Sequence, residues 1–115
     1  ILNHCIINDK FLVVSSLIPL TQLKLSLPDL KSRIKQFYIL NIDIPSDQLI
    51  YSLILKFFSD NQVIIKKELI EFIVKKIDRS YPRINQFLVK LNDLSIERKK
   101  KIDFKLINEI IDAME

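Results

Sequence analysis

Residues 78–88 read Asp78-Arg79-Ser80-Tyr81-Pro82-Arg83-Ile84-Asn85-Gln86-Phe87-Leu88, the pattern of a polar turn that opens an amphipathic helix. Ser80 is a good N-cap, and Pro82 suits the first helical turn because its missing N–H costs little there. Apolar side chains then recur at helical spacing: Ile84, Phe87, Leu88, Leu91 and Leu94. Arg83 stands in the first turn, where a cation opposes the helix macrodipole. The position indicates a nearby anion, the alternative being an ordinary solvated surface arginine.

Three more amphipathic helices accompany this one. Ser46 is the expected N-cap of a helix that runs through Ser59, a second helix spans about residues 66–77, and Asp103 caps the last. The inward side chains predicted for these three helices are Leu49, Ile50, Leu53, Ile54, Phe57 and Phe58, then Leu69, Ile70, Ile73 and Ile77, then Leu106, Ile107, Ile110 and Ile111. Four such helices with short connections predict a small bundle over residues 43–115.

Residues 1–42 have a different pattern. Residues 1–8 look like the tail of a helix, and residues 26–34 like a short helix that Ser26 caps. Residues 11–16 form an apolar run typical of a buried strand, and residues 36–41 are a second, weaker strand candidate. Two strands cannot bury both faces of a sheet, so another polypeptide or upstream residues should complete it. The predicted fold class is mainly α, with one or two short strands before the four-helix bundle.

Composition excludes several classes of enzyme site. The 115 residues include no glycine, which both a P-loop and a Rossmann fingerprint require for tight turns and close backbone approach. Cys5 is the only cysteine, so these residues hold neither a disulfide framework nor a cysteine-based zinc site of the usual kind. His4 is the only histidine, and no motif supports a Ser-His-Asp triad around it.

The charge balance is mildly basic, with a formal net charge of +4. The one long basic run, residues 98–101, permits contact with nucleic acid without requiring it, and a solvated turn between helices is the alternative. No apolar run reaches the roughly 18 residues of a membrane span, and no signal peptide opens the chain. We therefore expect a cytoplasmic protein. The start at Ile1 indicates a fragment, a trimmed chain or an unusual start.

Taken together, residues 11–112 resemble the C-terminal half of the AAA+ module in the DnaA/Hda family, and most closely its Hda form. The segments that carry the resemblance stand in the family's order, and together they are fairly specific. They are residues 11–16 (the sensor 1 strand), 27–34 (the box VII helix), 40–58 (the link and first lid helix), 72–83 (the run into sensor 2) and 101–112 (the end of the lid).

The resemblance implies a role for each of four residues. Arg33 would be the arginine finger, which acts in trans on nucleotide bound by a neighbouring subunit. Arg83 would be sensor 2 and contact the phosphates of nucleotide held by its own module. Ser15 or Ser16, with Ser16 the choice, would be sensor 1. A planar guanidinium suits the first two roles because it pairs with phosphate oxygens at fixed geometry. Residues 1–42 would be the remnant of the base subdomain and residues 43–115 the lid.

The chain also departs from the family. The Walker A and B segments would lie upstream of Ile1, so we expect no enzyme activity and no cofactor for this chain alone; ATP or ADP with Mg is implied only for a complete module. Ile84-Asn85 follows Arg83 where DnaA has Glu-Leu, and Lys35-Gln36 replaces an aromatic-glycine pair. No helix-turn-helix domain follows Glu115, so we expect an Hda-like or a truncated protein and not a full initiator.

Three functions remain open. The first is regulation or initiation of chromosomal replication, with DnaA or another AAA+ subunit as partner and the sliding clamp as a further one. The second is a non-catalytic helical interaction module descended from an AAA+ lid, which includes a gene remnant. The third is a small nucleic-acid binder that uses Lys99 to Lys101, and direct DNA binding is the least favoured. A P-loop motif encoded upstream would favour the first.

Overall fold

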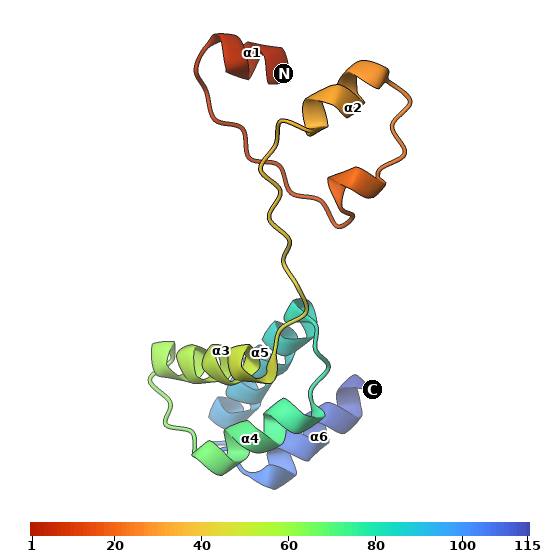
Figure 1. Cartoon of the computed structure of the whole chain (residues 1–115). Coiled ribbons are helices and arrows are strands. Elements are labelled where there is room, and N and C mark those ends of the chain that lie inside the picture. Colours follow the sequence, from red (N-terminus) through yellow and green to blue (C-terminus); the bar gives the residue numbers. More distant parts are fainter. The chain divides into compact units, whose positions relative to one another are not determined.

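The computed structural model describes all residues from 1 to 115 and contains six α-helices, one 3-10 turn and no strand. The chain divides into two compact units, Ile1–Ile42 and Asp43–Glu115. Figure 1 shows the second unit as a cluster of the four helices α3 to α6. The prediction of a mainly α chain is confirmed.

The second unit consists of α3 (Asp47–Asp60), α4 (Lys67–Lys76), α5 (Tyr81–Glu97) and α6 (Phe104–Met114). Helix α3 packs against α4 and α5, and α6 packs against the same two helices (Figure 1). Each helix therefore has two neighbours that cover its apolar stripe, as the helices of a small bundle require.

Three helix starts follow the predicted local chemistry. Ser46, Ser80 and Asp103 are the N-caps of α3, α5 and α6, and each side-chain oxygen accepts a hydrogen bond from the backbone N–H three residues later. The three donor–acceptor distances are 3.2, 3.3 and 2.7 Å. Each bond satisfies one of the backbone donors that a helix start leaves free, so the caps fix where these helices begin.

The helix ends show how a chain without glycine terminates its helices. Asp9, Gln62 and Lys99, which follow α1, α3 and α5, have φ angles of 49°, 58° and 50°. After α3, the N–H of Val63 donates to the carbonyl of Phe58 at 2.8 Å, the long bond of a Schellman motif. Side chains with a Cβ thus occupy the left-handed positions that glycine usually fills, at a steric cost.

The hydrophobic core lies entirely in the second unit. Fourteen apolar side chains are buried there: Ile50, Ile54, Phe58, Leu69, Ile70, Ile73, Val74, Ile84, Phe87, Leu88, Leu91, Leu106, Ile107 and Ile110. Most predicted inward positions are among them. Three on α3 are not, because Leu49 is 40% exposed and both Leu53 and Phe57 are only partly buried. The helix buries a narrow stripe at four-residue spacing, not the broad face that its sequence predicts.

The first unit has two short helices, α1 (Leu2–Ile7) and α2 (Pro28–Ile34), and a 3-10 turn, η1 (Leu20–Gln22). It buries no side chain completely, and Phe11 and Leu17 are fully exposed at 101% and 104%. The unit therefore has no core of its own.

Two predictions for the first unit are wrong. Residues 11–16 and 36–41 form no strand, because a strand needs a partner for its backbone N–H and C=O groups and this unit supplies none. Ser26 does not cap α2, whose N-cap is Leu27 without a side-chain hydrogen bond. Pro28 occupies the first turn and sets the start of this helix through its fixed φ angle.

Candidate functional site

Arg83 lies in the first turn of α5, where the sequence predicts it. The backbone N–H of Arg83 donates a hydrogen bond to the Ser80 hydroxyl at 3.3 Å, and this bond fixes the backbone of Arg83. Its side chain is exposed, and Nη1 donates to the carbonyl oxygen of Met114, at the end of α6, at 3.2 Å. The acceptor beside Arg83 is thus a neutral backbone carbonyl and not the anion that the sequence predicts. The other N–H donors of the guanidinium have no hydrogen-bond partner within the chain.

A hollow of about 340 Å³ opens beside the Arg83 guanidinium. Its walls come from the end of α4, the start of α5 and the end of α6, and its lining residues are Lys76, Ile77, Asp78, Arg83, Phe87, Ile111, Met114 and Glu115. Two cations and two carboxylates line it. An anion that enters would meet Arg83 and Lys76, with Asp78 and Glu115 opposing it.

Lys76 is held in place by two contacts outside the hollow. Its Nζ donates to Oδ1 of Asn108 on α6 at 3.1 Å and lies 4.9 Å from the centre of the Phe72 ring. Phe72 in turn meets the edge of Phe104 with ring centres 5.1 Å apart. Residues of both α4 and α6 therefore position Lys76. Arg83 differs from it because a planar guanidinium can donate hydrogen bonds to two oxygens of one anion.

Arg33 lies on α2, in the first unit. It is partly buried, and its Nη1 donates to Oδ1 of Asn3 on α1. Leu30 and Ile34 on the same helix are partly buried, whereas Lys31 is exposed. The arginine therefore sits at the border of a surface helix, and the contact with Asn3 is one that the sequence does not predict.

Ser15 and Ser16 are exposed and lie in a stretch without regular structure. The Ser16 hydroxyl donates to the carbonyl of Ile18 at 2.8 Å and accepts from the Ile18 N–H at 3.2 Å. This is a local turn, in which the hydroxyl caps its own backbone. The sensor 1 residue predicted at the end of a strand is therefore found in a turn.

The predicted site residues belong to different units: Ser16 and Arg33 to the first, Arg83 to the second. The structure surrounds Arg83 with Lys76, Asp78 and Glu115, none of which the sequence singled out. Asp78 lies three residues before α5, within the polar turn that predicts the helix start, so its place near Arg83 could be predicted from the sequence. Lys76 and Glu115 reach the hollow only through packing.

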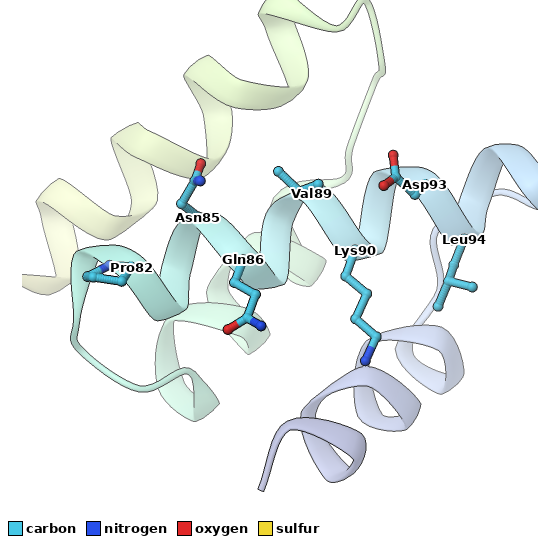
Figure 2. Close-up of a pocket in the computed structure, with 7 residues that line it drawn as sticks. All are labelled: Pro82, Asn85, Gln86, Val89, Lys90, Asp93 and Leu94. Carbon is cyan, nitrogen blue, oxygen red and sulfur yellow. The ribbon is translucent and has the colours of Figure 1, made fainter.

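A second, shallower hollow of about 610 Å³ lies along the outer face of α5. Figure 2 shows Asn85, Val89 and Asp93 on one side of the helix and Gln86, Lys90 and Leu94 on the other. All the lining residues come from this one helix, and Val89 is 42% exposed. None of the side chains that line this hollow is a histidine, a cysteine or a hydroxyl, and its charged groups are Lys90 and Asp93.

A group of metal-ligating side chains and a helix able to cross a membrane are both absent from the structure. No three side chains among histidine, cysteine, aspartate and glutamate come together as a group able to hold a metal ion. None of the helices combines the length and the apolar character that crossing a membrane demands.

Comparison with known proteins adds no relative. No protein-family model matches the chain, and neither a curated protein nor a solved structure does.

Proposed function

We propose that this chain is part of a DnaA/Hda-like AAA+ protein, which acts in the initiation of chromosomal replication or its regulation through nucleotide-dependent interaction with DnaA. Residues 43–115 would be the lid subdomain and residues 1–42 the C-terminal remnant of the base. The observation that carries the proposal is the position of Arg83, exposed at the capped start of the third helix in a four-helix unit and facing a polar hollow.

Arg83 fits a contact with a phosphate. Its backbone is fixed by the Ser80 cap, so its guanidinium starts from a defined place, and a guanidinium pairs with two phosphate oxygens at once. The chain has no glycine for a backbone phosphate cradle, so its fit to ATP or ADP with Mg is limited to this one contact. The nucleotide would supply the phosphoryl group that a complete module transfers, and this chain by itself would be no enzyme.

Arg33 supports the second part of the proposal. It lies on a short surface helix beside exposed cations, from which a guanidinium could reach the nucleotide of a neighbouring AAA+ subunit. A positively charged guanidinium there would stabilise the charge that develops on a phosphoryl group during transfer. DnaA is the proposed partner, the sliding clamp a further one for an Hda-like protein, and the cytoplasm the proposed compartment.

A binding measurement tests the nucleotide dependence. The purified chain is titrated onto immobilised DnaA loaded with ATP or with ADP. We expect tighter binding to the ATP form, and we expect Arg33→Ala to lose that preference because it removes the guanidinium that faces the nucleotide. Lys31→Ala is the matched control, since it removes one exposed positive charge from the same helix. Equal affinity of the wild-type chain for both forms would count against the proposal.

The alternative is a non-catalytic helical interaction module derived from an AAA+ lid. It is favoured by the first unit, which exposes Phe11, Val13 and Leu17 almost completely and so presents apolar surface to a partner. Under this alternative the chain binds a protein partner equally well with either nucleotide or with none. The same titration therefore separates the two functions.

A further inference from the structure

The positive charge of the chain is concentrated in one short segment. Residues 98–105 contain five of the 18 lysines and arginines but only one of the 14 acidic residues, Asp103. The rest of the chain therefore carries 13 cations and 13 carboxylates, so the whole formal net charge of +4 belongs to residues 98–105, which form the turn after α5 and the first two positions of α6. Such concentration makes a local positive field that the composition of the whole chain understates.

The backbone of this basic turn (residues 98–105) is held by several hydrogen bonds. The N–H of Lys99 donates to the carbonyl of Ile96 and that of Lys100 to the carbonyl of Ser95, both at 3.1 Å. The Ser95 hydroxyl then donates to the carbonyl of Lys100 at 2.6 Å. Asp103 caps α6 and fixes the far side of the turn. The lysine side chains consequently project from a defined backbone and not from a loose loop.

The acidic neighbours neutralise only part of the charge. Glu109 on α6 takes both hydrogen bonds of the Arg98 guanidinium, at 2.8 and 2.7 Å. Lys105 and Lys100 lie close enough to help lower the pKa of the Glu109 carboxyl, although the hydrogen bond from Arg98 is the main cause. Four exposed lysines of the turn have no salt bridge: Lys99, Lys100, Lys101 and Lys105.

We propose that the basic turn binds the phosphodiester backbone of a nucleic acid, with these four lysines as the contacting groups. The proposal is independent of the AAA+ function. Direct DNA binding ranks last on sequence alone, because a basic run is commonly a solvated turn. The fixed backbone and the concentrated charge now favour it. A membrane surface fits less well, since an interfacial helix needs an exposed apolar face. Helices α5 and α6 bury most of theirs, and the exposed apolar side chains beside the turn are two, Ile96 at 65% and Phe104 at 48%.

The salt dependence of binding gives the proposal a measurable form. Each phosphate contact contributes about −0.9 to the slope of log K against log salt on duplex DNA. Four lysines therefore predict a slope of at most about −3.6, and binding that weakens on the order of 10²-fold between 50 and 200 mM salt. A lysine contact is a point charge without base readout, so DNA sequence should matter little.

The test is a fluorescence anisotropy titration of a labelled 20-base-pair DNA duplex, and of one of its strands, with the full chain. Lys100→Gln/Lys101→Gln should weaken binding at 50 mM salt by roughly 10²-fold and reduce the salt slope by about 2. Lys75→Gln/Lys90→Gln is the charge-matched control, because both lysines are exposed, lie in the same unit and form no salt bridge. It should keep most of the affinity.

Three results would overturn the proposal. One is the absence of binding to both duplex and single strand at 50 mM salt. Another is an equal loss of affinity in the two double variants, which would assign the binding to net charge and not to the turn. The last is sedimentation with vesicles of anionic phospholipid that exceeds DNA binding and is lost in Lys100→Gln/Lys101→Gln, which would assign the turn to a membrane surface. Thermal unfolding followed by circular dichroism checks that both variants are folded.

Discussion

Arg98 and Glu109 form a two-point ion pair that spans the turn between α5 and α6, with N–O distances of 2.8 and 2.7 Å. Arg98 is the C-cap of α5, and Glu109 lies in the middle of α6. Their side chains are 43% and 46% exposed, so the pair contributes little to overall stability. Its main consequence is geometric, because it fixes one side of the basic turn and leaves the lysines on it free.

This pair makes part of the stability depend on pH. The hydrogen bond from Arg98 lowers the pKa of the Glu109 carboxyl below the ordinary value of a glutamate side chain. The folded state then favours the charged carboxylate, so the stabilisation is present above the unfolded pKa and is lost as pH falls through the folded one. We expect the urea midpoint of the wild-type chain to fall more steeply between about pH 5 and pH 3 than that of Glu109→Gln.

The partner substitution provides the control. Arg98→Gln removes the cause of the lowered pKa, so it should flatten the same part of the pH profile as Glu109→Gln does. Parallel profiles for the wild type and Glu109→Gln would mean that the ion pair is absent in solution.

A second prediction concerns the core. Ile54 is completely buried on α3, whereas its neighbour Leu53 is only partly buried. Ile54→Ala should lower the free energy of unfolding by about 2–5 kcal/mol, since it removes buried methyl groups and leaves a cavity. Leu53→Ala, at a position that the sequence places in the core, should cost clearly less. Urea unfolding measures both, and a larger loss for Leu53→Ala would contradict the packing of α3.

The left-handed residue after α3 offers a stabilising substitution. Gln62 has a φ of 58°, where a Cβ is unfavourable, so Gln62→Gly should raise the free energy of unfolding by about 0.5–1 kcal/mol. Ser59→Gly, at an exposed position within the helix, should instead destabilise by a similar amount, about 0.5–1 kcal/mol. Thermal unfolding should move the two variants in opposite directions, and destabilisation by both would contradict the left-handed end of α3.

Amide exchange tests the difference between the two units. All fourteen core residues lie in Asp43–Glu115, and no side chain of Ile1–Ile42 is fully buried. We expect strong protection of the helical amides in α3 to α6 and weak protection throughout the first unit, because local opening costs little where few apolar contacts are lost. Equal protection across the chain would show that the first unit has a core after all.

Much of the second unit could be predicted from the sequence because its signals are local. Helices α3, α5 and α6 each begin at an N-cap residue (Ser46, Ser80 and Asp103) whose side chain accepts a hydrogen bond from the backbone N–H three residues later. Local signals of this kind do not decide whether residues 11–16 form a strand. An apolar run shows a preference for extended structure, but a strand also needs a partner that lies elsewhere in the sequence or outside it.

In the candidate site, too, local features could be predicted from the sequence and contacts between helices could not. The place of Arg83 in the first turn follows from Ser80 and Pro82 beside it. Its contact with Met114, which is 31 residues away, depends on how α5 and α6 pack. The same holds for Lys76 and Asn108, 32 residues apart. Periodicity identifies which face of a helix is buried, but not which residues of two helices come opposite each other.

We propose that Arg33 acts on nucleotide held by a partner AAA+ subunit, and the rate of ATP hydrolysis by purified DnaA measures this action. Hydrolysis is followed with DnaA alone and with the wild-type chain, Arg33→Ala, Arg33→Lys or Lys31→Ala in excess. We predict stimulation by the wild type and by Lys31→Ala. Arg33→Ala should lose it, on the order of 10³-fold if Arg33 behaves like other arginine fingers. Arg33→Lys should lose most of it, because an ammonium lacks the planar fork. Equal stimulation by the wild type and Arg33→Ala, or no stimulation by either, would show that Arg33 does not act on the nucleotide of DnaA.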